Sequence, residues 1–138
     1  MNDALTLPRH TVNQLLAAAQ AIPAEEVCGF IATAPDGEHR VYPVANIADD
    51  RRCYYQMDPA QQIAALRAMR DGNEQLLCIY HSHPQGPAHP SQTDRHEANY
   101  PEAIYLIISL QTGGVLELRA FRIITPDSVT ELALQIGD

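Results

Sequence analysis

The chain has 138 residues, with seventeen acidic side chains against nine basic ones and a formal charge of −8 at pH 7. This length is enough for one hydrophobic core without a disulfide or metal staple, so we expect a single domain over residues 1–138. No run of lysine or arginine occurs, and no apolar run reaches the roughly 18 residues that a membrane span needs. Composition therefore argues against nucleic acid and membranes as partners. The first residues carry no targeting pattern, so we expect a cytoplasmic protein.

The cysteines give no sign of a disulfide framework. Cys28, Cys53 and Cys78 are odd in number, isolated from one another, and set in apolar or strand-like surroundings. We interpret all three as reduced core residues rather than as a disulfide set or a CxxC metal site.

The first predicted element is a helix over about residues 9–22, where apolar side chains recur at i, i+3, i+4 and i+7. Pro23 marks its end. A buried strand should follow over 26–34. The sequence "PDG" at 35–37 then predicts a tight turn, because proline presets φ and glycine accepts a positive φ. Residues 38–46 should return as the second strand of a hairpin.

The middle of the chain predicts a short strand over 53–57 and then a second helix. Asp58 and Pro59 suit the cap and the first turn of that helix. One face of this helix should carry the apolar side chains of Ile63, Leu66 and Met69. Gly72 should end the helix.

The apolar run "QLLCIYHSH" at 75–83 predicts a central strand. Strands over 103–111 and 115–124, joined by "TGG" at 112–114, should form a hairpin, and a last strand is expected over 129–136. The order predicts an α/β fold in which a mixed, largely antiparallel sheet is flanked by two to three helices.

Metal-binding residue types gather at the end of the predicted central strand. His81 and His83 are two positions apart, so on a strand their imidazoles project from the same face. A proline-rich loop then brings the chain back to Asp94. Two imidazoles and one carboxylate suit a catalytic Zn²⁺, which takes three protein ligands and leaves a position for water. Zinc can lower the pKa of such a water to about 7 and polarise a carbonyl, so hydrolysis of an amide becomes feasible.

A general base is expected upstream, in "PAEEVCGF". Glu26 lies at the edge of the predicted strand, where its carboxylate could take a proton from the water and pass it to the leaving nitrogen. The residue pattern alone does not separate Glu25 from Glu26.

These segments together resemble the JAMM (MPN+) zinc metallopeptidases, whose signature is an upstream glutamate followed by H-[ST]-H-P-x6-S-x2-D. Here "HSHP" is followed by six residues and then "SQTD", with a glutamate two positions before Cys28-Gly29. Asn46 and "YQMDP" at 55–59 also resemble family segments, so the resemblance covers roughly residues 10–125. It implies an MPN (cytidine-deaminase-like) domain with a zinc ion. The implied roles are zinc ligand for His81, His83 and Asp94, general acid/base for Glu26, and support of the oxyanion and of the water for Ser91.

Simpler interpretations apply to some of the same residues. Ser91 and Asp94 also form an ordinary capping signature for a helix at 93–100, and a carboxylate bound to zinc could not give its full strength to a cap. We expect His89 in a loop and His96 at an exposed helix position.

The resemblance also implies a substrate class. JAMM enzymes hydrolyse the amide after the C-terminal Gly-Gly of ubiquitin or a ubiquitin-like protein. The short separation between Asp94 and the strand expected near Ala103 leaves little room for the insertions of the family's deubiquitinases. The chain looks more like bacterial members that act beside ThiS/MoaD-like sulfur carriers, either trimming the carrier to Gly-Gly or releasing cysteine from a conjugate. A deubiquitinase-like isopeptidase and a non-catalytic MPN scaffold are the alternatives.

Overall fold

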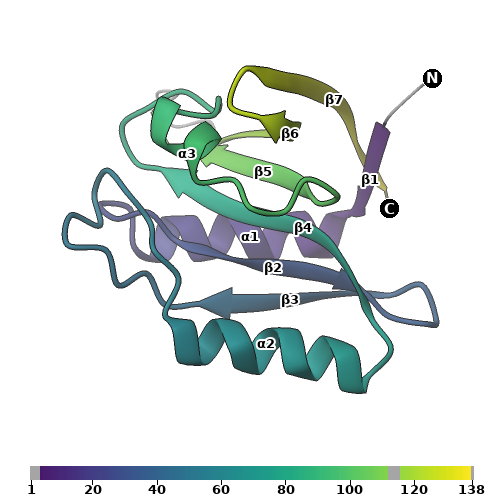
Figure 1. Ribbon diagram of the computed structural model, residues 1–138. Helices are drawn as coiled ribbons and strands as arrows, with labels where there is room; N and C mark the ends of the chain where they lie inside the picture. Colours follow the sequence, from purple (N-terminus) through teal and green to yellow (C-terminus); the bar gives the residue numbers. More distant parts are fainter. Residues whose placement is uncertain (1–3, 112–115, 138) are drawn as a thin grey trace.

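Seven strands form one curled sheet in the computed structural model, which describes residues 4–111 and 116–137 (Figure 1). The strand order is β1-β7-β6-β5-β4-β2-β3. The pairs β1/β7 and β4/β5 are parallel, and the other neighbouring pairs are antiparallel. The prediction of a mixed, largely antiparallel sheet with up to three helices is thereby confirmed. The elements are β1 (Ala4–Pro8), α1 (Arg9–Ala21), β2 (Cys28–Thr33), β3 (His39–Val44), α2 (Pro59–Asp71), β4 (Gln75–His83), α3 (Gln92–His96), β5 (Ile104–Ser109), β6 (Glu117–Thr125) and β7 (Ser128–Gly137).

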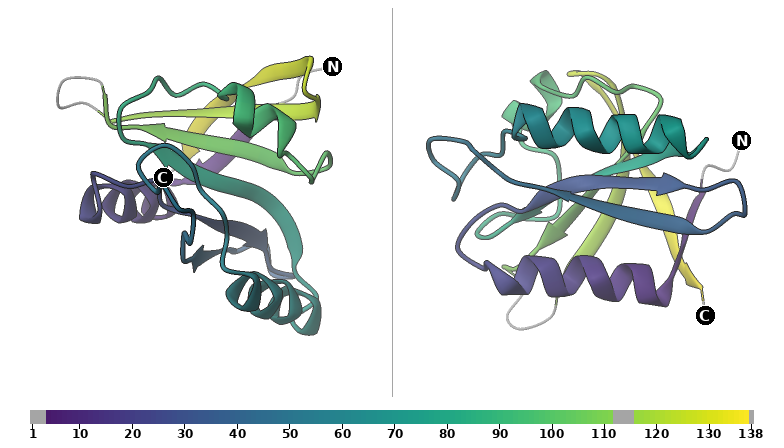
Figure 2. Two further views of the ribbon diagram at one scale, coloured as in Figure 1. Left: turned by 60° about the vertical axis from the view of Figure 1, so that its left-hand side comes forward. Right: turned by 90° about the horizontal axis from the view of Figure 1, so that it is seen from below.

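The two long helices cover opposite faces of the sheet (Figure 2). Alternate side chains of β2 and β4 enter opposite cores, because successive Cβ atoms point to opposite faces. On β4, Cys78 and Tyr80 belong to the core that contains the buried side chains of α1. Ile79 belongs to the core that contains Ala65 and Met69 of α2. Residues 81 and 83 continue the parity of Ile79, so they lie on the α2 face.

Both predicted helices form, close to their expected bounds. In α1, Val12, Leu15 and Ala19 are buried, as their spacing predicts. In α2, Pro59 occupies the first turn, but Asp58 makes no capping hydrogen bond with its side chain. Ile63 is 55% exposed, because the buried stripe of α2 runs through Ala65 and Met69. None of the helices in the described residues is long and apolar enough to cross a membrane.

Three expectations were wrong or incomplete. The strand expected at 53–57 is a loop, which contributes one bridge between Asn46 and Met57. The strand β1 was not predicted, because its two inward side chains give too short a pattern; it is held by parallel pairing with β7, at the far end of the sequence. Cys53 is exposed on the loop, whereas Cys28 and Cys78 are buried, so only two of the three free cysteines are core residues. The "TGG" connection at 112–114 lies outside the described residues, although the strands on either side of it do pair antiparallel.

Gly29 in β2 allows a close approach of two neighbouring strands. A Cβ at this position would collide with the backbone oxygen of Tyr42 and with the ring and hydroxyl of Tyr80, which is almost fully buried. Neither neighbour can give way easily, because one is backbone and the other is packed in the core.

Substituting Gly29→Ala should therefore lower the free energy of unfolding by about 1–3 kcal/mol, the usual cost of overpacking a core. Urea unfolding followed by circular dichroism would measure it. Gly137→Ala is the matched control, since Gly137 also lies in a strand and an added Cβ there meets its nearest atoms at an ordinary contact distance of 3.8 Å. Equal stability of the two variants would contradict this account of Gly29.

Candidate active site

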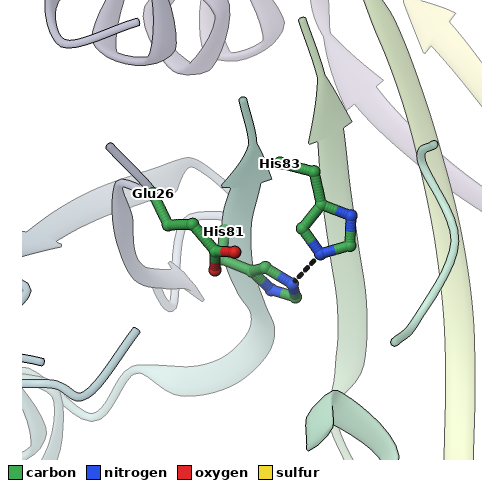
Figure 3. Close-up of side chains that lie close together, drawn as sticks. All are labelled: Glu26, His81 and His83. Carbon is green, nitrogen blue, oxygen red and sulfur yellow. Dashed lines mark hydrogen bonds between the residues drawn. The ribbon is translucent and has the colours of Figure 1, made fainter. Parts of the chain in front are cut away.

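The carboxyl end of β4 presents two histidines on one face of the sheet. His81 and His83 are buried, with 1% and 7% of their surfaces exposed. β4 lies between β2 and β5, and this central position restricts both imidazoles. Their Nε2 atoms are 3.0 Å apart, as the dashed line in Figure 3 marks.

Pairing between β2 and β4 brings Glu26 to the same place. Cys28 is the partner of His81 in the antiparallel register. One step further, Val27 donates its backbone N–H to the hydroxyl of Ser82 at 2.9 Å, and the backbone N–H of Ser82 donates to the carbonyl of Val27 at 3.0 Å. These two bonds extend the pairing beyond β2, so Glu26 lies beside the histidines (Figure 3).

Asp94 reaches the histidines from the first turn of α3. Its Oδ2 is 3.1 Å from Nε2 of His81 and 3.0 Å from Nε2 of His83. The same oxygen accepts the backbone N–H of Ser91 at 2.9 Å, and the hydroxyl of Ser91 accepts the backbone N–H of Asp94 at 3.0 Å. The capping box expected as the simpler interpretation is therefore present, and it holds Asp94 toward the histidines at the same time.

The donor atoms fit a metal ion by their geometry and chemistry. The two Nε2 atoms and Oδ2 of Asp94 form a triangle with sides of 3.0, 3.0 and 3.1 Å. Tetrahedral zinc with ligands at about 2.0–2.1 Å would set these atoms about 3.3 Å apart. Donor atoms of Glu26, His81 and His83 also lie within 4.8 Å of one another, so this group can hold a metal ion.

The outer hydrogen bonds differ between the two histidines. Nδ1 of His83 donates to the carbonyl of Pro87 at 2.8 Å, which leaves the lone pair of Nε2 pointing into the site when the ring is neutral. His81 stacks on Tyr55, with ring centres 4.6 Å apart. Nδ1 of His81 is buried and has no hydrogen-bond partner among the described residues.

Charge in the site shifts two pKa values in opposite directions. Burial alone would raise the pKa of Asp94, but the two histidines and the N–H of Ser91 hold it well below its usual range. Burial alone would lower the pKa of His83, but its hydrogen bond with Asp94 raises it. Without a metal, the cluster therefore favours an ionised Asp94 beside a protonated imidazole.

The structure separates the two glutamates that the residue pattern alone left equivalent and of which the family resemblance favoured Glu26. Glu26 is 5% exposed, and its Oε1 has no hydrogen-bond partner in the described part of the chain. Burial raises the pKa of Glu26 to about 8, with a smaller opposing effect of His83. Glu25 points away and forms a half-exposed ion pair with Arg51, at 3.0 Å.

Asn46 organises the loop beside Glu26, a role that the sequence did not suggest. Its side-chain nitrogen donates to the backbone oxygens of Glu26 and Tyr54, both at 2.9 Å. Its side-chain oxygen accepts the backbone N–H groups of Ala48 and Gln56, both at 3.0 Å. All four hydrogen-bonding positions of the amide are thus used. The sequence offered one signal, the resemblance of the segment around Asn46 to a segment of the JAMM family. Nothing in the residues next to Asn46 indicates which backbone groups it binds.

Two cavities flank the histidines. The smaller one has a volume of about 440 Å³ and is lined by Glu26, His83 and Ser91, together with the 84–90 loop and residues 52 and 53. The larger one, of about 900 Å³, lies on the other side of Tyr55 and is bounded by the 48–57 loop, α3 and Tyr100.

The remaining histidines and the buried cysteines take no direct part in this cluster. His89 lies in the loop and packs edge-on against Phe121, and His96 is exposed on α3, as expected. Burial raises the pKa of both Cys28 and Cys78 to about 12, so both thiols stay protonated.

Comparisons with known proteins agree with the motif. The family described as prokaryotic homologs of the JAB domain matches residues 8–124. A protein of Mycobacterium tuberculosis named "CysO-cysteine peptidase" is 35% identical over 130 residues, which are 92% of this chain and 87% of that protein. A protein of Haloferax volcanii named "Desampylase" is 37% identical over 89 residues, which are 63% of this chain and 64% of the relative.

A solved structure extends the likeness to the fold. The solution structure of a protein from Desulfitobacterium hafniense matches with a TM-score of 0.81 and 34% identity, and the match covers 99% of this chain and 94% of that one. The hydrolase class expected from the motif agrees with the names of the two relatives. Because the family match spans most of the sequence, and the mycobacterial relative is similar over nearly all of it, the chain belongs to the prokaryotic homologs of the JAB domain.

Proposed function

We propose that the protein is a zinc-dependent peptidase that cuts the bond after the C-terminal Gly-Gly of a ubiquitin-like, ThiS/MoaD-type sulfur carrier. The observation that carries this proposal is the convergence of two Nε2 atoms and Oδ2 of Asp94 beside the buried carboxyl of Glu26, whose Oε1 has no hydrogen-bond partner among the described residues. Relatives named as a CysO-cysteine peptidase and a desampylase support the substrate class.

His81, His83 and Asp94 are the residues proposed to hold the zinc ion. When bound, zinc supplies Lewis acidity, which activates water for attack and polarises the substrate carbonyl. The carbonyl of Pro87 keeps His83 in the tautomer that a ligand needs, and the capping box keeps the carboxylate of Asp94 in place.

Glu26 is proposed to move the proton. Its carboxylate takes a proton from the attacking water and delivers it to the leaving nitrogen. Ser91 lines the same cavity, and its oxygen accepts a hydrogen bond from the N–H of Asp94. The hydroxyl hydrogen of Ser91 can therefore be donated to the oxyanion of the substrate.

The deciding experiment is mass spectrometry of a panel of ubiquitin-fold substrates, with and without a zinc chelator. The panel holds sulfur carriers extended past Gly-Gly, a carrier–cysteine adduct and an isopeptide-linked ubiquitin dimer. Chelator-sensitive release of a carrier ending in Gly-Gly is the expected result. Cleavage of the dimer alone would favour a deubiquitinase, and cleavage of nothing would favour a scaffold.

Removing a proposed ligand should remove the metal. Asp94→Ala and His83→Ala are expected to bind less than one tenth of the zinc that the wild type binds, as measured by elemental analysis after dialysis, because two ligands remain. His96→Ala is the control, since His96 is exposed on the same helix. Full zinc occupancy in both ligand variants would contradict the assignment.

Removing the proton carrier should leave the metal but stop the reaction. Glu26→Gln keeps the shape of the side chain, so zinc content should be unchanged while kcat falls about 10²–10⁴-fold. Glu25→Gln, at the neighbouring exposed position, should keep wild-type kcat. If Glu26→Gln retained full activity, Glu26 could not be the general base.

The buried Glu26 should also make the metal-free protein less stable as pH rises. Its pKa is raised to about 8 in the folded state from 4.5, so the folded state holds a proton that the unfolded chain releases. Its stabilising effect is complete below about pH 4.5 and is lost by about pH 8. Relative to Glu26→Gln, the wild type in chelator should lose unfolding free energy across this range, as measured by urea titration. A constant difference would mean that Glu26 is ionised throughout.

A further inference from the structure

We propose that Arg52 binds the free α-carboxylate of the residue released from the carrier, in the smaller cavity beside Glu26. This inference rests on the proposed function and adds a residue that determines specificity on the leaving side. It follows from the position of Glu26, from the charges of the two cavities and from the unused hydrogen-bond donors of Arg52.

The leaving residue must lie on the side of the proton donor. A general acid has to reach the nitrogen that departs. Glu26 lines the smaller cavity and does not line the larger one. The leaving residue therefore belongs in the smaller cavity.

The charges of the two cavities also favour the smaller one for a leaving residue that ends in a carboxylate. Three carboxylates line the larger cavity, those of Asp49, Asp50 and Glu97, and no lysine or arginine does so among the described residues. Arg52 is the single arginine or lysine that lines the smaller cavity in the described part of the chain. Asp50 is paired with Arg52, which leaves Asp49 and Glu97 as the unpaired acidic residues of the larger cavity in the described part of the chain. In the smaller cavity, which also contains Glu26, Arg52 is the group that can attract an anionic end of a substrate.

The backbone places Arg52 next to the reaction. The backbone N–H of Glu26 donates to the carbonyl of Arg51 at 2.7 Å, so the residue that follows Arg51 stands directly beside the general base. Nε of Arg52 donates to Asp50 at 3.1 Å, which restricts the guanidinium. Within the described residues, the two terminal nitrogens of Arg52 have no hydrogen-bond partner in the protein, and together they can bind a carboxylate.

The dimensions of the smaller cavity suit one residue. Its 440 Å³ lies at the lower end of the range for small-ligand sites, and its wall contains Pro84, Pro87 and Pro90, which limit its deformation. An amino acid with a free carboxylate fits this description. The nitrogen of the leaving residue, which belongs to the bond that is cut, would face Glu26. The carboxylate of the same residue would face Arg52.

The test compares two carriers that differ only at the terminal group. Both end in Gly-Gly-Ala, one with a free carboxylate and the other with a carboxamide. Wild-type enzyme should process the acid with kcat/KM about tenfold above that of the amide, mainly through KM, as expected for one charge-assisted contact at an exposed arginine. Arg52→Gln should remove this preference, so that kcat/KM for the acid falls to the level for the amide. Arg51→Gln, which alters the neighbouring arginine outside both cavities, should keep the preference.

A binding measurement separates this proposal from the proposed function. Glu26→Gln and the double variant Glu26→Gln/Arg52→Gln can be titrated with both carriers by calorimetry, without turnover. The single variant should bind the acid more tightly than the amide, and the double variant should bind both equally. Equal affinities in the single variant, or a preference that survives the loss of Arg52, would overturn the role of Arg52. Absence of cleavage by the wild type would refute the peptidase and leave the binding result to decide on Arg52.

Discussion

The register between β2 and β4 is the constraint on which the site depends. Val27 and Ser82 exchange two hydrogen bonds, one through backbone and one through a side chain, just beyond the last regular pair of these strands. A slip by one residue would turn every side chain of β2 to the other face of the sheet. Glu26 would then enter the core on the α1 side, and the histidines would lose their acidic neighbour. The two apolar cores, one on each face, make such a slip costly because both would have to be repacked.

Burying the polar side chains of the site lowers the stability of the folded chain. Glu26, His81 and His83 are buried, and two of their polar atoms lack hydrogen-bond partners in the described residues. Unpaired buried polar atoms are uncommon in proteins and are tolerated where the surrounding structure compensates for them. Here the compensation comes from a sheet in which β4 and β5 are buried over most of their length. The same rigidity holds the three donor atoms at nearly equal separations.

Local patterns predicted what depends on local physics. The apolar run of β4 and the spacing of α1 were sufficient for both elements, and the compound motif named the residues that the fold brings together. Features held by distant partners escaped prediction. β1 forms because β7 pairs with it. The 48–57 loop takes its path because the side chain of Asn46 binds four backbone groups. Glu25 and Glu26 have equal propensities, so only the spacing of the family motif favoured Glu26, and the strand register that places its side chain beside the histidines is not visible in the sequence. Arg52 carries no motif at all, and only the path of the loop brings it to the cavity.

The oxygen that Asp94 shares between a helix cap and two imidazoles has a consequence in acid. Because the pKa of Asp94 lies well below its usual range and that of His83 is raised, mild acid protonates the imidazole while the carboxylate remains ionised. The positive charge beside Asp94 is then that of the protonated imidazole, so the two side chains form a buried ion pair. The cap of α3 survives this exchange, because the bond from the N–H of Ser91 needs only an ionised carboxylate. Acid in this range should thus change the charge of the cluster while the scaffold that positions it stays assembled.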